Sequence, residues 1–61
     1  MYISLGDAEV IAATERAVLV ELDGEERWFP RAVLRDGDAA DKGDVIEVEL
    51  EAWFASKEGL A

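Results

Sequence analysis

The clearest local signal in this chain of 61 residues is the stretch RAVLVELDGEERWFP at positions 16–30. Two runs rich in aliphatic, β-branched and aromatic residues flank the pair Asp23-Gly24. An Asp-Gly pair between such runs is typical of a two-residue type I′ turn, because both turn residues need a positive φ. We therefore predict a β-hairpin whose second strand ends at Pro30, since proline has no N–H to donate to a sheet.

The two-residue loop also predicts which residues of the two strands lie opposite each other. One face of the hairpin then carries three pairs: Leu22 with Glu25, Val20 with Arg27, and Val18 with Phe29. The other face carries two pairs: Leu19 with Trp28, and Glu21 with Glu26. We expect the first face to supply the core.

Apolar and polar residues alternate at residues 2–5 and 45–50, which predicts two further strands. Residues 8–13 are rich in small and β-branched residues and are predicted to form another extended segment. Gly6-Asp7 is expected to end the strand at residues 2–5. Thr14-Glu15 is expected to turn the chain after residues 8–13.

The period changes at the end of the chain. Residues 51–60 fit one or two helical turns, with Lys57 near the helix end, Gly59 at the C′ position and Leu60 placed for the contact of a Schellman ending. Together these elements predict one mainly β domain over residues 1–61. It is a small, strongly bent antiparallel sheet or barrel, SH3-like or OB-like, with a short C-terminal helix.

Composition restricts the chemistry that this chain can perform. It has six Lys and Arg against fifteen Asp and Glu, a formal charge of −9, and neither Cys nor His. Disulfides, thiolate zinc sites and Ser-His or Cys-His pairs are therefore excluded, and a domain this small has little room for a substrate cleft. We predict a protein that is not an enzyme and has no catalytic residue and no cofactor.

The sequence also predicts where in the cell the protein is found. No apolar stretch is long enough for a membrane span or a signal peptide, so we expect no contact with a membrane. Lack of Cys and of a leader fits a cytoplasmic protein.

The connection between the hairpin and the last predicted strand is acidic. Residues 31–34 are too short to assign, and residues 35–44 are predicted to form a loop. Four carboxylates in this region are the oxygen ligands that calcium prefers: Asp36, Asp38, Asp41 and Asp44. However, the position of a calcium loop that needs glycine is occupied by Asp41, so we predict a polar connection and no metal site.

Each aromatic pair is expected to divide between core and surface. Phe29 points to the core with Val18, and Trp28 then points to the opposite face. One interpretation has the terminal helix lay Trp53 over Trp28 and hide both; the alternative leaves one tryptophan exposed as an anchor for a partner.

A charge of −9 disfavours binding to nucleic acid, because such affinity comes mainly from Lys and Arg. Glu47, Glu49 and Glu51 alternate along the last strand and share one side, about 6.7 Å apart. We therefore predict an acidic module that binds a basic protein surface through these three glutamates, with Trp28 as anchor. The role we expect for such a module is that of an accessory protein or of a regulatory or inhibitory one.

Two alternatives stay open. Arg27, Trp28 and Arg31 lie close in sequence, and arginines beside an aromatic ring stack single-stranded bases, although neighbouring glutamates account for the arginines as ion-pair partners. This favours an accessory single-stranded nucleic-acid-binding protein. The other alternative is a structural protein that forms a homodimer to cover its exposed surface.

Residues 14–31, TERAVLVELDGEERWFPR, resemble a segment of short phage and prophage proteins of unknown function. Those proteins show an apolar strand, an Asp-Gly-type turn, and then Trp, an aliphatic residue, Pro, a cation and Ser. Their ends are similar to Glu51–Phe54 followed by Gly59-Leu60. The resemblance implies a setting near phage recombination and replication without an activity or a catalytic residue. This chain departs from the pattern at Ala32, where serine is usual.

Overall fold

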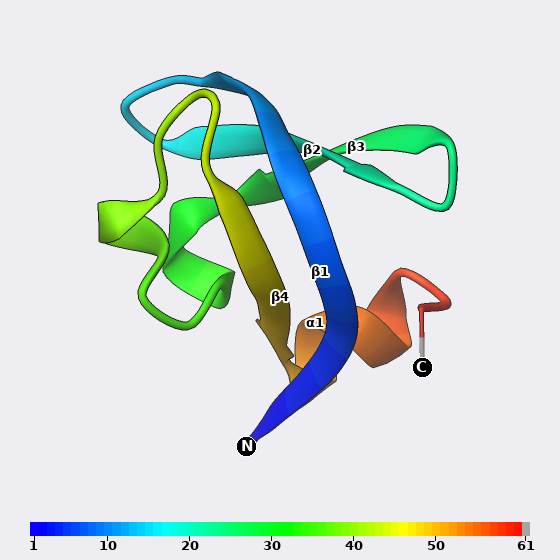
Figure 1. The fold of residues 1–61 in the computed structure, drawn as a ribbon. Coiled ribbons are helices and arrows are strands. Elements are labelled where there is room, and N and C mark those ends of the chain that lie inside the picture. Colours follow the sequence, from blue (N-terminus) through cyan, green and yellow to red (C-terminus); the bar gives the residue numbers. More distant parts are fainter. Residues whose placement is uncertain (61) are drawn as a thin grey trace.

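A computed structural model describes residues 1–60 of the chain (Figure 1). Its elements are β1 (Tyr2–Ala13), β2 (Ala17–Leu22), β3 (Glu25–Pro30), the 3-10 turns η1 (Arg31–Val33) and η2 (Gly37–Ala39), β4 (Val45–Glu51) and α1 (Ala52–Lys57). The strands form one antiparallel sheet in the order β3-β2-β1-β4. Three consecutive strands followed by a fourth beside the first make a Greek-key order. The prediction of a mainly β fold with a short C-terminal helix is confirmed.

The β2–β3 hairpin has the predicted turn and register. Asp23 and Gly24 both have positive φ, 52° and 83°, as a type I′ turn requires. All five predicted pairs are present, from Leu22–Glu25 at the turn to Val18–Phe29. Local sequence alone therefore determines this part of the sheet.

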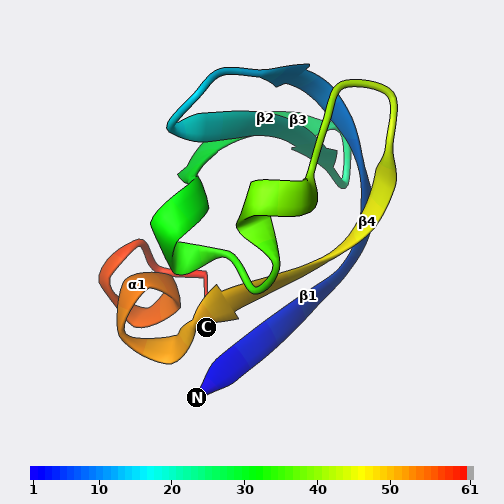
Figure 2. The ribbon, with the colours of Figure 1, turned by 90° about the vertical axis from the view of Figure 1, so that its left-hand side faces the viewer.

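The prediction that Gly6-Asp7 ends the first strand is wrong, because β1 runs without a break through 12 residues. Its register against β4 shifts between Ser4 and Asp7, and Gly6 lies there with a φ of 96°. A glycine with positive φ is what a β-bulge uses to insert extra residues without ending the strand. The strand bends instead of stopping, and a second register shift between Val10 and Ala12 adds to its curvature (Figure 2).

The curved sheet has an inner and an outer face. The inner face surrounds the 31–44 connection and is closed at one end by α1, as Figure 2 shows. The largest of the almost completely buried side chains are those of Val10, Val18, Val20, Phe29, Val48 and Leu50. The core is therefore built from alternate residues of all four strands.

The C-terminal segment ends as a Schellman motif. Gly59 has a φ of 72° and donates its N–H to Ser56 O (3.2 Å), while Leu60 N–H donates to Ala55 O (2.8 Å). Ala55 is completely buried and Leu60 packs partly against the core. The predicted helix end is confirmed.

The interpretation in which Trp53 covers Trp28 is wrong. Trp53 is 58% exposed and Trp28 is 51% exposed. Phe54 instead contacts Phe29 edge to face, with ring centroids 6.2 Å apart. Successive residues of a helix point about 100° apart, so the residue that reaches the core turns its neighbour outward.

The connection of residues 31–44 contains more regular structure than predicted, both in the unassigned residues 31–34 and in the predicted loop 35–44. It contains both 3-10 turns, and Leu34 forms an isolated antiparallel bridge with Leu50 of β4. Arg35 N–H donates to Glu49 O at 2.9 Å. After leaving β3, the chain therefore crosses to the free edge of β4 and forms one bridge with it.

Candidate functional site

The outer face of the sheet carries many acidic side chains. In every strand the residues between the core positions point outward. Seven of these outward residues are acidic: Asp7, Glu9, Glu21, Glu26, Glu47, Glu49 and Glu51. They come from all four strands and form an acidic band across the sheet, which we call the acidic face.

Several of these carboxylates lie directly opposite one another on neighbouring strands. The register pairs Asp7 with Glu47, Glu9 with Glu21, and Glu21 with Glu26. Like charges at directly opposite positions destabilise a sheet. The fold therefore keeps a row of uncompensated negative charge that sheet stability does not favour.

The three glutamates predicted as partner contacts lie together on this face, but their surroundings differ. Glu47 is exposed and accepts a hydrogen bond from Ser4 Oγ (2.8 Å). Glu49 is half-buried and forms an ion pair with Arg35 Nη1 (3.1 Å). The hydrogen bond and charge of Glu49 raise the pKa of the Arg35 guanidinium. Among residues 1–60, Glu47 has no ion-pair partner, so its charge is not neutralised there.

Glu51 is held at the start of α1. Its Oε2 accepts a hydrogen bond from Trp53 Nε1 at 3.0 Å. This bond keeps the half-exposed Trp53 ring beside the C-terminal end of β4, where Glu51 lies. Glu51 therefore orients an aromatic side chain as well as contributing charge.

Trp28 lies on the same side of the sheet as the acidic face. It is opposite Leu19, two pairs along the hairpin from Glu21–Glu26, and about half of its surface is exposed. A large aromatic side chain exposed beside charged groups is the usual composition of an interface anchor.

The three residues of the nucleic-acid alternative do not share one surface. Arg27 lies opposite the buried Val20, on the inner side of β3, whereas Trp28 points outward. Arg27 forms an ion pair with Glu25 at 3.5 Å. The alternation of a strand separates the two neighbours.

Arg31 is half-buried and holds the fold together. Its Nε donates to Thr14 O (2.9 Å), and its Nη1 donates to Gly37 O (2.6 Å) and Ala40 O (2.8 Å). The guanidinium thus ties the β1–β2 turn to the β3–β4 connection. Arginine carries five N–H donors, so one guanidinium can serve three carbonyl groups of separate segments.

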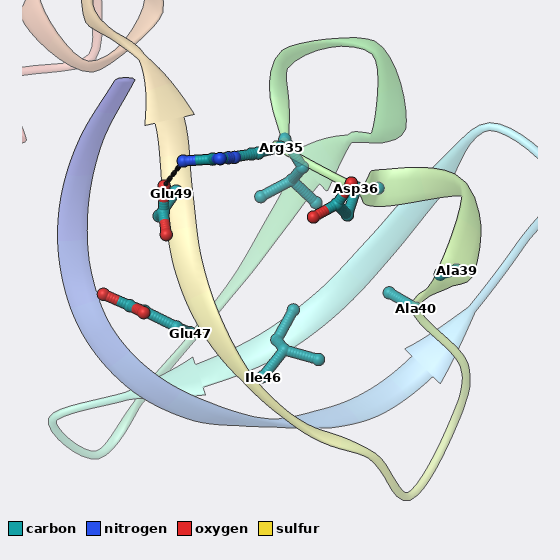
Figure 3. A pocket seen from close by; sticks show the side chains of 9 residues that line it. Arg35, Asp36, Ala39, Ala40, Ile46, Glu47 and Glu49 are labelled. Atoms are coloured by element: carbon teal, nitrogen blue, oxygen red, sulfur yellow. Dashed lines mark hydrogen bonds and ion pairs between the residues drawn. The ribbon is translucent and has the colours of Figure 1, made fainter.

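A pocket of about 330 Å³ lies between β4 and the 31–44 connection (Figure 3). In Figure 3 the side chain of Ile46 points toward Ala40 across the opening, Asp36 points in from the opposite wall, and Arg35 reaches across to Glu49. Sequence reasoning did not find this pocket, because its walls come from two segments that only the fold brings face to face.

The four aspartates of the connection do not converge. Within residues 1–60, no group of three or more carboxylates is arranged to hold a metal ion. Asp44 Oδ2 instead accepts a hydrogen bond from the N–H of Asp41 at 2.9 Å, which stabilises a turn before β4.

None of the helices within residues 1–60 has the length and apolar character that a membrane span requires.

Asp7 and Glu9 of the acidic face were missed by sequence reasoning. Asp7 was assigned to a turn, and the neighbours of both residues are known only once β1 pairs with β2 and β4. Comparison with known proteins found no matching family model, no matching curated protein and no matching solved structure. The acidic face therefore has to be interpreted from its own chemistry.

Proposed function

We propose that this protein is a small non-enzymatic interaction module that binds a basic surface of a protein partner through its acidic face. The observation that carries the proposal is that Trp28 and seven carboxylates share one face of the sheet. A basic partner would relieve the repulsion between the opposed carboxylates, so binding would offset a cost that the free fold carries.

Each part of the face has a distinct role in this proposal. The carboxylates, Glu47 among them, attract the partner over distance and speed encounter, as charges at the rim of an interface do. Trp28 supplies apolar contact area and slows dissociation. We place the module in the cytoplasm, as a regulatory or accessory protein of the phage type that residues 14–31 resemble.

We also propose that the domain is a partly closed small barrel of the SH3-like or OB-like kind. The Greek-key strand order and the Leu34–Leu50 bridge, which brings the chain after β3 back to β4, support this proposal. Small barrels commonly present one curved face to a partner.

The experiment is a binding measurement with the partner captured from the native host. The double variant Glu21→Lys, Glu47→Lys changes the charge from −9 to −5, since each substitution adds two charges. We expect its association rate to fall about tenfold at low salt and to depend less on salt than that of the wild type. Trp28→Ala should mainly raise the dissociation rate.

The matched control is Glu15→Lys, Glu58→Lys, which reaches the same charge of −5 through exposed residues outside the sheet. Equal slowing by both double variants would mean that only net charge matters and would contradict the proposal. So would tight binding of the wild type to a single-stranded oligonucleotide at physiological salt, which would favour the nucleic-acid alternative.

A further inference from the structure

The backbone of β4 pairs with β1 through every second residue. Ala52 N–H donates to Met1 O (2.9 Å), and Val10 N–H donates to Asp44 O (2.8 Å). Even-numbered residues of this segment therefore direct their backbone groups toward β1. Because the N–H and C=O of one residue in an antiparallel strand point the same way, odd-numbered residues direct theirs to the free edge.

The chain itself uses one end of this free edge. Arg35 N–H donates to Glu49 O, next to the Leu34–Leu50 bridge. Asp36 then adopts a left-handed conformation (φ 56°, ψ 29°) and turns the chain into η2. In the described part of the chain, Val45 and Glu47 have no backbone hydrogen bond from the connection. Pairing between the connection and the free edge of β4 is therefore limited to the Leu34–Leu50 bridge and the Arg35–Glu49 backbone hydrogen bond.

The pocket of about 330 Å³ lies where that pairing stops. Ile46, Ala39 and Ala40 supply apolar walls next to the open backbone groups of Glu47 (Figure 3). The carboxylate of Asp36 points into the opening, while Glu47 points to the outer side of the strand. Three carboxylates line the pocket, and Arg35 forms an ion pair with that of Glu49. The other two, Asp36 and Glu47, have no ion-pair partner within residues 1–60.

We propose that the free edge of β4 binds an extended segment of the basic partner as an added antiparallel strand. A lysine or arginine of that segment lies opposite Glu47, and the residues on either side of it place small aliphatic side chains in the pocket against Ile46. An added strand takes its affinity from main-chain hydrogen bonds and its specificity from alternate side chains. The inference rests on the proposed function, from which it takes a basic partner, and adds where and in what form the partner binds.

Charge argues against a second copy of this chain as the occupant. A symmetric antiparallel pairing of two β4 strands centred on Glu47 would place two Glu47 carboxylates opposite each other. Like charges at such positions disfavour pairing. A basic segment meets the same edge with complementary charge.

The probe is the acetylated and amidated peptide Thr-Val-Lys-Val-Thr, titrated into the ¹⁵N-labelled full chain. We expect saturable amide shifts at Val45, Glu47 and Asp36. Methylating the backbone nitrogen of the peptide lysine removes one strand hydrogen bond and keeps the charge, and should weaken binding about tenfold. Replacing the lysine by glutamate should abolish binding.

Protein variants locate the contact. Glu47→Lys and Ala39→Trp, which fills the pocket from an exposed position, should each weaken binding about tenfold. Glu21→Lys makes the same charge change on the acidic face away from this edge, and should weaken it less than about twofold.

Equal binding of the methylated peptide, or equal loss in Glu21→Lys and Glu47→Lys, would overturn strand addition. Absence of binding by the basic peptide would overturn it as well. Shifts at the same amides that appear on concentrating the protein alone would assign the edge to a second copy and also overturn it. None of these outcomes tests the proposed function, which is tested separately by the binding kinetics of the double variants with the captured partner.

Discussion

The inner and outer faces of the sheet are made by alternating residues of the same strands, yet the two faces differ in burial and packing. Val18, Val20 and Phe29 are almost completely buried, and their size and shape are constrained by close packing. Their neighbours Glu21 and Trp28 face solvent and contact little. Substitutions on the inner face should therefore change stability strongly, while those on the outer face should change stability weakly and binding strongly.

The largest effect should come from uncovering the inner face. Truncating the chain after Ala52 removes Phe54, Ala55 and Leu60, all of which pack on the core. At about 25 cal/mol per Å² of apolar surface, this loss approaches the whole stability of so small a domain. We expect no cooperative thermal transition by circular dichroism. The control is Trp53→Ala in the full chain, which removes an exposed ring and should melt cooperatively.

The adjacent pair on β3 tests the two faces one residue apart. Phe29→Ala should cost about 3–5 kcal/mol of unfolding free energy, because it leaves a cavity beside Phe54. Trp28→Ala should cost less than about 1 kcal/mol, since half of the ring is already exposed. Urea denaturation of the two variants measures the difference. Similar losses in both would show that Trp28 belongs to the core and is no free anchor.

The smallest effect has the opposite sign. Glu21→Lys replaces two like-charge pairs, with Glu9 and with Glu26, by attractive ones. We expect a gain of about 0.2–1 kcal/mol per pair that diminishes as salt is added. Glu15→Lys, in the turn after β1, carries the same charge change without these neighbours. An equal gain in both variants would attribute the effect to net charge rather than to the acidic face.

Prediction from sequence succeeded where the information is local. The Asp23-Gly24 turn fixes the register of β2 with β3, and Gly59 fixes the end of α1. It failed at Gly6, where the same residue type lies in a bulge inside a strand. A glycine with positive φ suits both a turn and a bulge, and only the partner strand selects between them.

The candidate site divides in the same way. The alternation of side chains along a strand is enough to predict that Glu47, Glu49 and Glu51 share one side. It does not predict that Arg35 neutralises Glu49, or that Arg31 is occupied by the carbonyl groups of Thr14, Gly37 and Ala40. Such contacts join residues of separate segments, so no local pattern encodes them.

By itself the sequence determined the hairpin, the inward and outward sides of β2, β3 and β4, the helix end and the excess of negative charge. Each depends on turn chemistry, on period or on composition, which act over a few residues. The tertiary structure alone decided that β1 bends instead of ending and that carboxylates of four strands meet on one face. It also decided that the free edge of β4 lies open beside a pocket. These features depend on which strands become neighbours, and burial of the shared core selects that pairing.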